Sequence, residues 1–177
     1  MSVVRFIECL HLGHEKMAKW RGYNNCEEYH KKLIKNWNNV VNKKDITYIL
    51  GDVTLEKSIY YPILDELKGN KYLVMGNHDM GKHNEEQLKY FKKIMGCVDY
   101  KGYLLTHCPI HPNEVVFYRG NIHAHLHENN LEEVVVSSGY DDEGSKPVKT
   151  LHKYFNVDAH RVNCTPISIN NLKYLNE

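Results

Sequence analysis

Short apolar runs and a long amphipathic segment alternate along the first half of the chain. The apolar runs cover residues 3–9, 46–50 and 72–75, and each suits a buried strand of a sheet that is covered on both faces. In residues 25–41, between the first two runs, large apolar side chains recur at helical spacing among lysines and asparagines. This pattern predicts an amphipathic helix packed on the sheet, with Asn24 or Asn25 as its N-cap.

Two further helices and a β-rich second half complete the predicted order. Residues 55–67 are expected to be helical at least after Pro62, and residues 84–95 are expected to form another helix. Lys101-Gly102 then separates two short apolar runs, which predicts a β-hairpin over residues 97–106. Other short strands are predicted at 115–118, 121–126, 134–136, 154–159 and 166–169, and residues 137–146 are expected to be irregular.

The order β-α-β-α-β-α, followed mostly by strands, favours an α/β fold. Two half-sheets would form one sandwich with helices outside it. The chain has 177 residues, which fits one domain with a sizeable core, so we expect a single domain over residues 1–177.

Polar residues with metal-binding chemistry follow the predicted strands. In chain order they are Cys9, His11, Asp52, Asn77, His78, Asp79, His107, His125 and His127. In open α/β sheets, ligands bind at the carboxyl ends of strands. A carboxylate, an asparagine and several histidines that converge at one sheet edge can hold two divalent metals. Because residues two apart share a face of a strand, Cys9 and His11 are expected to point the same way and Glu8 the other way.

Each of these residues also has an ordinary explanation when it is taken alone. Asp52 can cap a helix, Gly76-Asn77 can form a turn, and a single histidine is more often a surface or hydrogen-bonded core residue. Chance is a poor explanation for so many such groups placed directly after strands.

Composition adds to this picture. Twelve histidines, most of them in three clusters at predicted loops, favour metal chemistry. The five cysteines are odd in number and lack CxxC spacing, so we expect reduced thiols in a cytoplasm and no disulfide framework. A net charge of +1 provides no global field toward nucleic acid or membrane. No apolar stretch approaches the roughly 18–20 residues of a spanning helix, and the first residues lack the layout of a signal peptide.

Together these motifs resemble those of the calcineurin-like metallophosphoesterases, in particular the small single-domain members of bacteria and their phages. That family's pattern is DxH…GDxx…GNHD/E…H…GHxH. The matching segments are Gly51-Asp52-Val53-Thr54, Gly76-Asn77-His78-Asp79, the lone His107, and Ala124-His125-Leu126-His127 with alanine in place of the glycine. The resemblance covers most of the chain and implies a four-layer α/β/β/α sandwich of two mixed sheets flanked by helices.

The resemblance also implies a role for each matched residue. The implied ligands are His11, Asp52 and His127 for one divalent ion, and Asp52, Asn77, His107 and His125 for a second, with Asp52 bridging. His78, with Asp79 behind it, would steady the phosphate and protonate the leaving group. The implied reaction is attack of a metal-bridging hydroxide on a small phosphodiester or phosphomonoester, such as a nucleotide. The two ions are expected to be Mn, Fe, Zn or Ni.

The chain departs from the family's pattern at Cys9, which stands where the family has its first aspartate. Three interpretations are open. Cys9 is a thiolate ligand that favours softer metals such as zinc or ferrous iron, or the first metal binds weakly through three protein ligands, or catalysis is lost and a metal-binding or recognition role is kept. The last interpretation makes a non-catalytic binding protein the alternative to an enzyme. Retention of His78 and Asp79 favours the enzyme.

A nuclease is a weaker hypothesis. The lysines are spread among acids on the predicted helices and form no basic track for long nucleic acid. We therefore expect a small phosphate ester as the partner, without a membrane, in a bacterial cytoplasm or, for a phage protein, in that of its host.

Overall fold

Five short strands form the first sheet of the computed structural model, which describes residues 2–55, 57–79, 84–129, 131–138 and 146–175. These strands are β1 (Val4–Ile7), β2 (Ile46–Ile49), β3 (Asn70–Val74), β4 (Lys93–Met95) and β11 (Ile167–Ser168). Their order is β11-β1-β2-β3-β4, with β1 to β4 parallel and β11 antiparallel at one edge. The strands predicted from the first three apolar runs are confirmed, and their carboxyl ends share one edge of the sheet.

The second sheet contains β5 (Val98–Tyr100), β6 (Tyr103–Leu105), β7 (Gly120–His123) and β10 (Tyr154–Asn156), in the order β10-β7-β6-β5. β5 and β6 form the predicted antiparallel hairpin, whereas β7 runs parallel to both of its neighbours. A separate antiparallel pair consists of β8 (Val135–Ser138) and β9 (Lys146–Lys149). The chain is thus a mixed α/β protein with two mostly parallel sheets.

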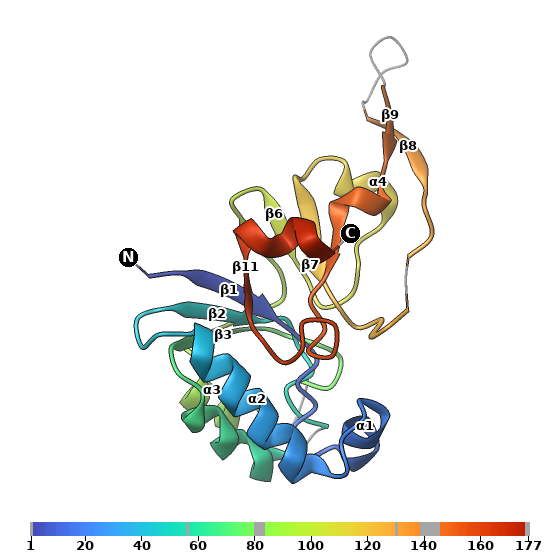
Figure 1. Ribbon diagram of the computed structural model, residues 1–177. Helices are drawn as coiled ribbons and strands as arrows, with labels where there is room; N and C mark the ends of the chain where they lie inside the picture. Colours follow the sequence, from blue (N-terminus) through green and yellow to red (C-terminus); the bar gives the residue numbers. More distant parts are fainter. Residues whose placement is uncertain (1, 56, 80–83, 130, 139–145, 176–177) are drawn as a thin grey trace.

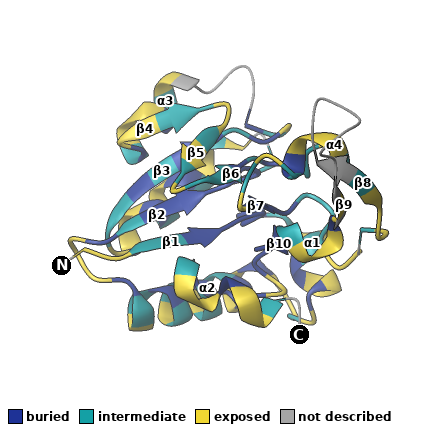
Figure 2. Cartoon of the chain, turned by 90° about the horizontal axis from the view of Figure 1, so that it is seen from above, coloured by how far each residue is buried: buried dark blue, intermediate teal, exposed yellow. Residues whose placement is uncertain are grey.

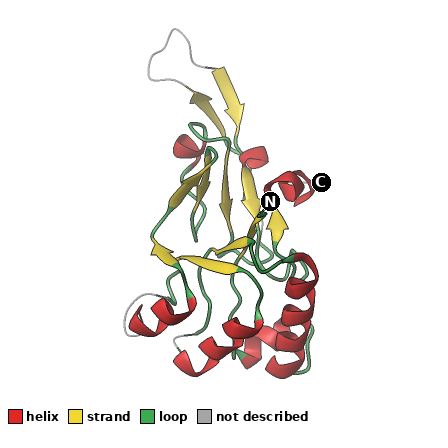
Figure 3. Cartoon of the chain, turned by 90° about the vertical axis from the view of Figure 1, so that its left-hand side faces the viewer, coloured by secondary structure: helices red, strands yellow, loops and turns green. Residues whose placement is uncertain are grey.

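Helices flank these sheets. The helical elements are α1 (Glu15–Trp20), α2 (Cys26–Val40), the 3-10 helix η1 (Ser58–Glu66), α3 (Asn84–Tyr90), α4 (Pro112–Val115) and the 3-10 helices η2 (Leu151–Lys153) and η3 (Ile169–Leu175). The first three α-helices lie on one side of the first sheet, and the second sheet lies on its other side (Figures 1 and 3). Within the described residues, no helix has both the length and the apolar character needed to cross a membrane.

Helix α2 forms for the reasons that the sequence suggests. The side chain of Asn25 accepts a hydrogen bond from the backbone N–H of Glu28 at 2.9 Å, which confirms it as the N-cap. Tyr29, Leu33 and Trp37 recur every four residues and are buried, so the helix packs one stripe against the sheet.

Aromatic side chains join the two sheets in the core. The rings of Phe6 on β1 and Tyr48 on β2 lie 5.8 Å and 5.9 Å from the ring of Tyr100 on β5. Buried residues are concentrated in the central strands, and the outer faces of the helices are exposed (Figure 2). These contacts pack the first sheet against the second within the core.

Several predicted elements are wrong. The helix expected over residues 84–95 ends at Tyr90, and Lys93–Met95 instead becomes β4, because its backbone pairs in parallel with β3. The strand expected at 115–118 is not formed, since His111 caps a helical turn that starts at Pro112 and ends at Val115. The segment around Pro62 is helical as expected, but it is a 3-10 helix with the proline inside it. The loop expected at 137–146 is wrong at its ends, since Ser137 and Ser138 belong to β8 and Lys146 begins β9, and residues 139–145 lie outside the described part of the chain.

Candidate metal centre

The predicted site residues converge where the carboxyl edges of the two sheets meet. Loops after β1, β2 and β3 contribute from the first sheet, and segments after β6 and β7 contribute from the second. Backbone bonds join the edges directly, since Glu8 N–H donates to Val157 O at 3.0 Å and Val157 N–H donates to His123 O at 2.8 Å. The stretch after β10 therefore ties β1 to β7 beside the site.

Five of the site residues have left-handed backbone conformations. They are Cys9 (φ 52°), His11 (φ 45°), Asp52 (φ 52°), His125 (φ 61°) and His127 (φ 52°). Such conformations are uncommon outside glycine and cost on the order of 1–3 kcal/mol each. Strain of this kind clusters at active sites and ligand clamps, so its concentration here makes the cluster the candidate functional site.

Two glycines allow the loops to approach one another. A Cβ at Gly51, which has φ 101°, would lie only 2.6 Å from Gly76 Cα and 2.6 Å from His107 Nδ1. A Cβ at Gly76 would overlap Asp52 Oδ1. The glycines that precede Asp52 and Asn77 are thus required for the close packing of this edge.

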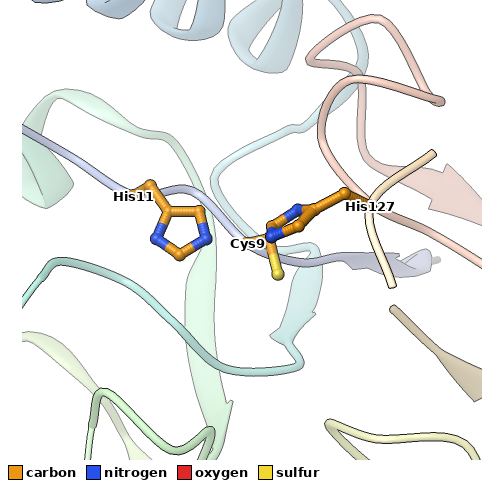
Figure 4. A group of neighbouring side chains, drawn as sticks. All are labelled: Cys9, His11 and His127. Carbon is orange, nitrogen blue, oxygen red and sulfur yellow. The ribbon is translucent and has the colours of Figure 1, made fainter. Parts of the chain in front are cut away.

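One group of potential ligands contains Cys9, His11 and His127, whose donor atoms all lie within 4.8 Å of one another. Cys9 and His11 extend from the segment after β1, and His127 approaches from a different segment (Figure 4). His11 is only 4% exposed, and neither of its ring nitrogens has a hydrogen-bond partner. Burial lowers the pKa of His11 to about 2, so the ring is neutral, which is the form that binds metals. A buried imidazole with two unpartnered nitrogens fits a metal ligand.

A second group surrounds His107. Its Nε2 lies 2.9 Å from Asn77 Oδ1 and 2.9 Å from His125 Nδ1, while its Nδ1 lies 2.9 Å from the carbonyl oxygen of Leu50. An Nδ1–H donated to a carbonyl leaves the lone pair of Nε2 pointing into the site. Nε2 thus faces an amide oxygen and a second imidazole, an arrangement that suits a cation. Cys108 lies beside these rings, its sulfur within 4.8 Å of the donor atoms of His107 and His125.

Asp52 lies between the two groups. Its Oδ2 is 3.9 Å from His11 Nε2 and 3.5 Å from His107 Nε2. Its Oδ1 accepts a hydrogen bond from the backbone N–H of His78 at 3.0 Å. One carboxylate is therefore within reach of both groups, which is the geometry that a bridging ligand needs.

The side chain of Glu8 does not point in the direction that strand alternation predicts. It was predicted to point away from the site, but its carboxylate is fully buried and its Oε1 contacts His107 Nδ1. The thiol of Cys9 lies 3.9 Å from the same oxygen, and Oε2 has no hydrogen-bond partner. The prediction failed because β1 ends at Ile7 and Cys9 is left-handed, so alternation does not extend through this segment.

Acidic groups crowd this edge. Burial, followed by the nearby carboxylates of Asp158 and Asp52, raises the pKa of Glu8 well above its ordinary value. Burial and the Glu8 carboxylate likewise raise the pKa of the Cys9 thiol. A divalent cation reverses both effects because it favours the charged form of each neighbouring acid. The donor set thus fits one or two bound cations.

Asp158 and Arg21 support the site and were missed by the sequence analysis. Asp158 Oδ2 lies 2.9 Å from His127 Nδ1 and 3.4 Å from Arg21 Nη2, and Arg21 also donates to Cys9 O at 2.6 Å. Burial alone raises the pKa of Asp158, but His127 and Arg21 bring it below its usual value. A carboxylate behind a histidine fixes the ring's tautomer and orientation. The one sequence signal for Asp158 is its place in the last long predicted strand.

Asp79 connects loops by its contacts. Its carboxylate accepts from the backbone N–H groups of Asp52 (2.6 Å), Val53 (3.1 Å) and Gly76 (2.8 Å). These bonds hold the loops after β2 and β3 together. That Asp79 also supports His78 in catalysis stays a prediction. The half-buried His78 directly precedes Asp79 in the sequence, and its ring centroid lies 6.0 Å from that of His11. All nine predicted site residues therefore lie in one connected cluster.

The fold and this cluster define an α/β protein with a candidate metal centre at the joined edges of two mostly parallel sheets. No protein-family model matches the chain. It is 32% identical over 176 residues to the uncharacterized protein MJ1445 of Methanocaldococcus jannaschii, with 96% of this chain and 88% of that protein covered, and it belongs to the same family.

Two other similarities differ in how much of the chain they cover. The Gene 66 protein of Mycobacterium phage L5 is 35% identical over 88 residues, which are 47% of this chain and 42% of that protein. The crystal structure of AQ665 from Aquifex aeolicus, a protein of unknown function, matches with a TM-score of 0.66 and 24% identity, covering 99% of this chain and 100% of that one. This second similarity shows a shared fold.

Proposed function

We propose that the protein is a metal-dependent phosphoesterase that hydrolyses a small phosphodiester or phosphomonoester at this centre. The observation that carries the proposal is the place of the Asp52 carboxylate between two groups of ligand atoms, 3.9 Å from His11 and 3.5 Å from His107. The resemblance to calcineurin-like metallophosphoesterases supports it, and we extend the proposal to that family's four-layer α/β/β/α sandwich.

The candidate ligands divide into two sets that share Asp52. The first set comprises His11 and His127, with Cys9 or Glu8 in addition, and the second comprises Asn77, His107 and His125. Two divalent ions, Mn, Fe, Zn or Ni, would supply an activated water and positive charge for the phosphate oxygens.

The chain's own residues provide orientation and proton transfer. His78 follows Asn77 directly and is half-buried, so its ring can reach a phosphate group held at the cluster. We assign His78 the role of general acid, which donates a proton to the leaving oxygen, a role that histidine performs near neutral pH. Asp158 keeps the ring of His127 in place, and Asp79 keeps the loop that carries His78 against the loop of Asp52.

The test is a metal-by-substrate screen. Protein purified without chelator would be analysed for metal, stripped, and reloaded with Mn, Fe(II), Zn or Ni before assay on bis(p-nitrophenyl) phosphate, cyclic nucleotides and phosphomonoesters. We expect hydrolysis that is lost with chelator and restored by at least one of these metals, and that is absent in Asp52→Asn. Metal binding without hydrolysis of any ester would contradict the proposal. It would favour the second candidate, a non-catalytic metal-binding protein, for which Cys9 in place of an aspartate is the specific observation.

Replacing Cys9 with aspartate is expected to improve manganese binding. The Cys9 sulfur lies among the ligand atoms of His11 and His127, where a thiolate offers one soft donor and an aspartate would offer two hard oxygens. We expect Cys9→Asp to raise manganese affinity and manganese-dependent hydrolysis about tenfold, equivalent to about 1.4 kcal/mol. Titration calorimetry and diester hydrolysis measure the two effects.

The same substitution at the exposed Cys97 is the matched control and should leave both quantities unchanged. Unaltered manganese affinity in Cys9→Asp would mean that Cys9 is a core residue and that the first site depends on other groups, with Glu8 the nearest carboxylate.

A further inference from the structure

An exposed tryptophan lies beside the candidate metal centre. Trp20 is the last residue of α1, and 43% of it is exposed. The centroid of its indole ring lies 5.8 Å from that of His127, a candidate ligand of the first set, and 5.4 Å from that of His160. Apolar side chains scattered over a surface are ordinary, so it is the contact with a candidate ligand that points to a role for Trp20.

The first ligand set reaches solvent on the side of His127. The side chain of His127 is 29% exposed, whereas that of His11 is 5% exposed and Cys9 is 0% exposed. His127 Nδ1 lies 2.9 Å from Asp158 Oδ2, which leaves Nε2 as the nitrogen for a metal. A phosphate that enters the first set from solvent therefore comes in beside His127, and the group attached to it comes within reach of Trp20.

The indole of Trp20 can stack against a further flat group. The rings of His127 and His160 are inclined to the indole by 63° and 48°, so neither of them lies parallel on its face. Aromatic groups prefer an offset parallel or an edge-to-face arrangement. Stacking of a base on an aromatic side chain is tolerant of sequence, because every base has a π face.

The backbone around Trp20 holds the ring in this position. The next residue, Arg21, is 5% exposed, and its guanidinium donates to Cys9 O at 2.6 Å and to Tyr29 Oη at 2.8 Å. The backbone N–H of Arg21 also donates to Met17 O at 3.0 Å. The end of α1 is thus tied to the segment that carries Cys9, and an indole that is already placed costs a ligand little in ordering.

We propose that Trp20 stacks against a flat aromatic group of the substrate, either a nucleobase or a simple aryl group, while the phosphate of the substrate is bound at the metal centre. This role rests on the proposed phosphoesterase function and names its substrate class. A saturated alkyl ester has no π face and gains less from the indole.

Non-hydrolysable phosphonates test this preference through binding alone. Zinc-loaded protein would be titrated calorimetrically with two matched pairs, the phosphonate analogues of AMP and of ribose 5-phosphate, and benzylphosphonate and cyclohexylmethylphosphonate. We expect at least one aromatic probe to bind about tenfold more tightly than its non-aromatic partner, equivalent to about 1.4 kcal/mol, which lies within the range for stacking of a base on an aromatic side chain. The pair with the larger ratio identifies the kind of aromatic group. Equal affinities within both pairs, or no binding of any probe, would overturn the proposal.

Failure of this proposal is distinguishable from failure of the proposed function, because phosphonates report binding and the ester screen reports hydrolysis. A protein that prefers the aromatic probes and hydrolyses no ester would contradict the phosphoesterase and support Trp20 as a platform for an aromatic phosphate ligand. A protein that hydrolyses esters but shows no preference would contradict the role of Trp20 alone.

Variants at Trp20 locate the platform. Trp20→Leu keeps an apolar side chain at an exposed position, so it should fold and retain its metal, and it should make the affinities within each pair nearly equal. Trp20→Phe should keep part of the preference. Tyr174→Ala, at an exposed aromatic residue on η3, is the matched control and should keep the wild-type ratio. A wild-type ratio in folded Trp20→Leu would contradict the proposal.

Intrinsic fluorescence gives an independent readout. The chain has two tryptophans, and the other one, Trp37, is fully buried. Stacking should change the emission of Trp20 as the aromatic phosphonate binds, and the change should be absent in Trp20→Leu, which retains Trp37. Binding of the aromatic probe to wild type without any change in emission would place the probe away from Trp20 and overturn the proposal.

Discussion

Replacing His78 with alanine should lower hydrolysis of phosphodiesters with poor leaving groups by about 10²–10⁴-fold, because a positioned general acid typically contributes this much. The loss corresponds to about 3–5 kcal/mol of transition-state stabilisation. Metal content should be nearly unchanged, since the link from His78 to Asp52 is made by its backbone N–H, which alanine retains. The measurements are steady-state rates on an alkyl diester and metal analysis of the same samples.

The leaving group provides an internal control for this prediction. Esters of p-nitrophenol need little protonation, so His78→Ala should lose much less activity on bis(p-nitrophenyl) phosphate than on the alkyl diester. His152→Ala, at an exposed histidine on η2, is the matched control and should behave as wild type. Full activity of His78→Ala on the alkyl diester would exclude the acid role.

Removing the guanidinium of Arg21 should destabilise the protein by about 3–5 kcal/mol, the usual cost of leaving a buried charge without its partner. Arg21 and Asp158 are both buried, with side chains 0% exposed, and their nearest atoms lie 3.4 Å apart. Arg21 also donates to Tyr29 Oη at 2.8 Å and to Cys9 O at 2.6 Å, and these bonds are lost in Arg21→Met. Urea unfolding of the metal-free protein measures the change in free energy.

Two controls separate this charge effect from a simple loss of packing. Arg119→Met, at an exposed arginine whose guanidinium lies 5.5 Å from the centroid of the Tyr103 ring, should change the free energy of unfolding by no more than about 1 kcal/mol, the usual worth of an exposed cation–π contact. Adding Asp158→Asn to Arg21→Met should recover part of the loss, because the buried negative charge that has lost Arg21 is then gone. A double variant as unstable as the sum of the two single variants would contradict the charge argument.

The pH dependence of Arg21→Met follows from the same pair. In wild type the pKa of Asp158 lies below its usual value, so the carboxylate contributes stability above its unfolded pKa, and this contribution is lost as the pH falls through the folded pKa. In the variant the carboxylate lacks Arg21 and protonates at higher pH. The deficit should therefore be largest near neutral pH and shrink in acid.

Local sequence patterns were sufficient to predict the elements that depend on local physics. The apolar runs became β1, β2 and β3, and Asn25 capped α2, because buried-strand composition and a capping side chain act within a few residues. Strand β4 could not be predicted in this way. Its three residues continue a helical periodicity, and only pairing with the distant β3 makes them extended.

The candidate site likewise contains residues that local patterns predict and residues that they do not. The nine residues were identifiable because each follows a predicted strand, and the carboxyl ends of parallel strands converge whatever the details of the loops. Glu8 could not be placed, since the left-handed backbone of Cys9 overrides strand alternation. Asp158 and Arg21 lie 137 positions apart in sequence, and no local pattern signals that they meet beneath His127.

The most direct test of the metal centre is a crystal grown with manganese, with diffraction data collected at the manganese absorption edge. We expect two anomalous peaks roughly 3.5–4 Å apart, one beside His11 and His127 and the other beside His107 and His125, with Asp52 between them. The refined ligands would also show whether Cys9 or Glu8 completes the first site. No peak among these residues, at a manganese concentration that saturates binding in solution, would contradict the account.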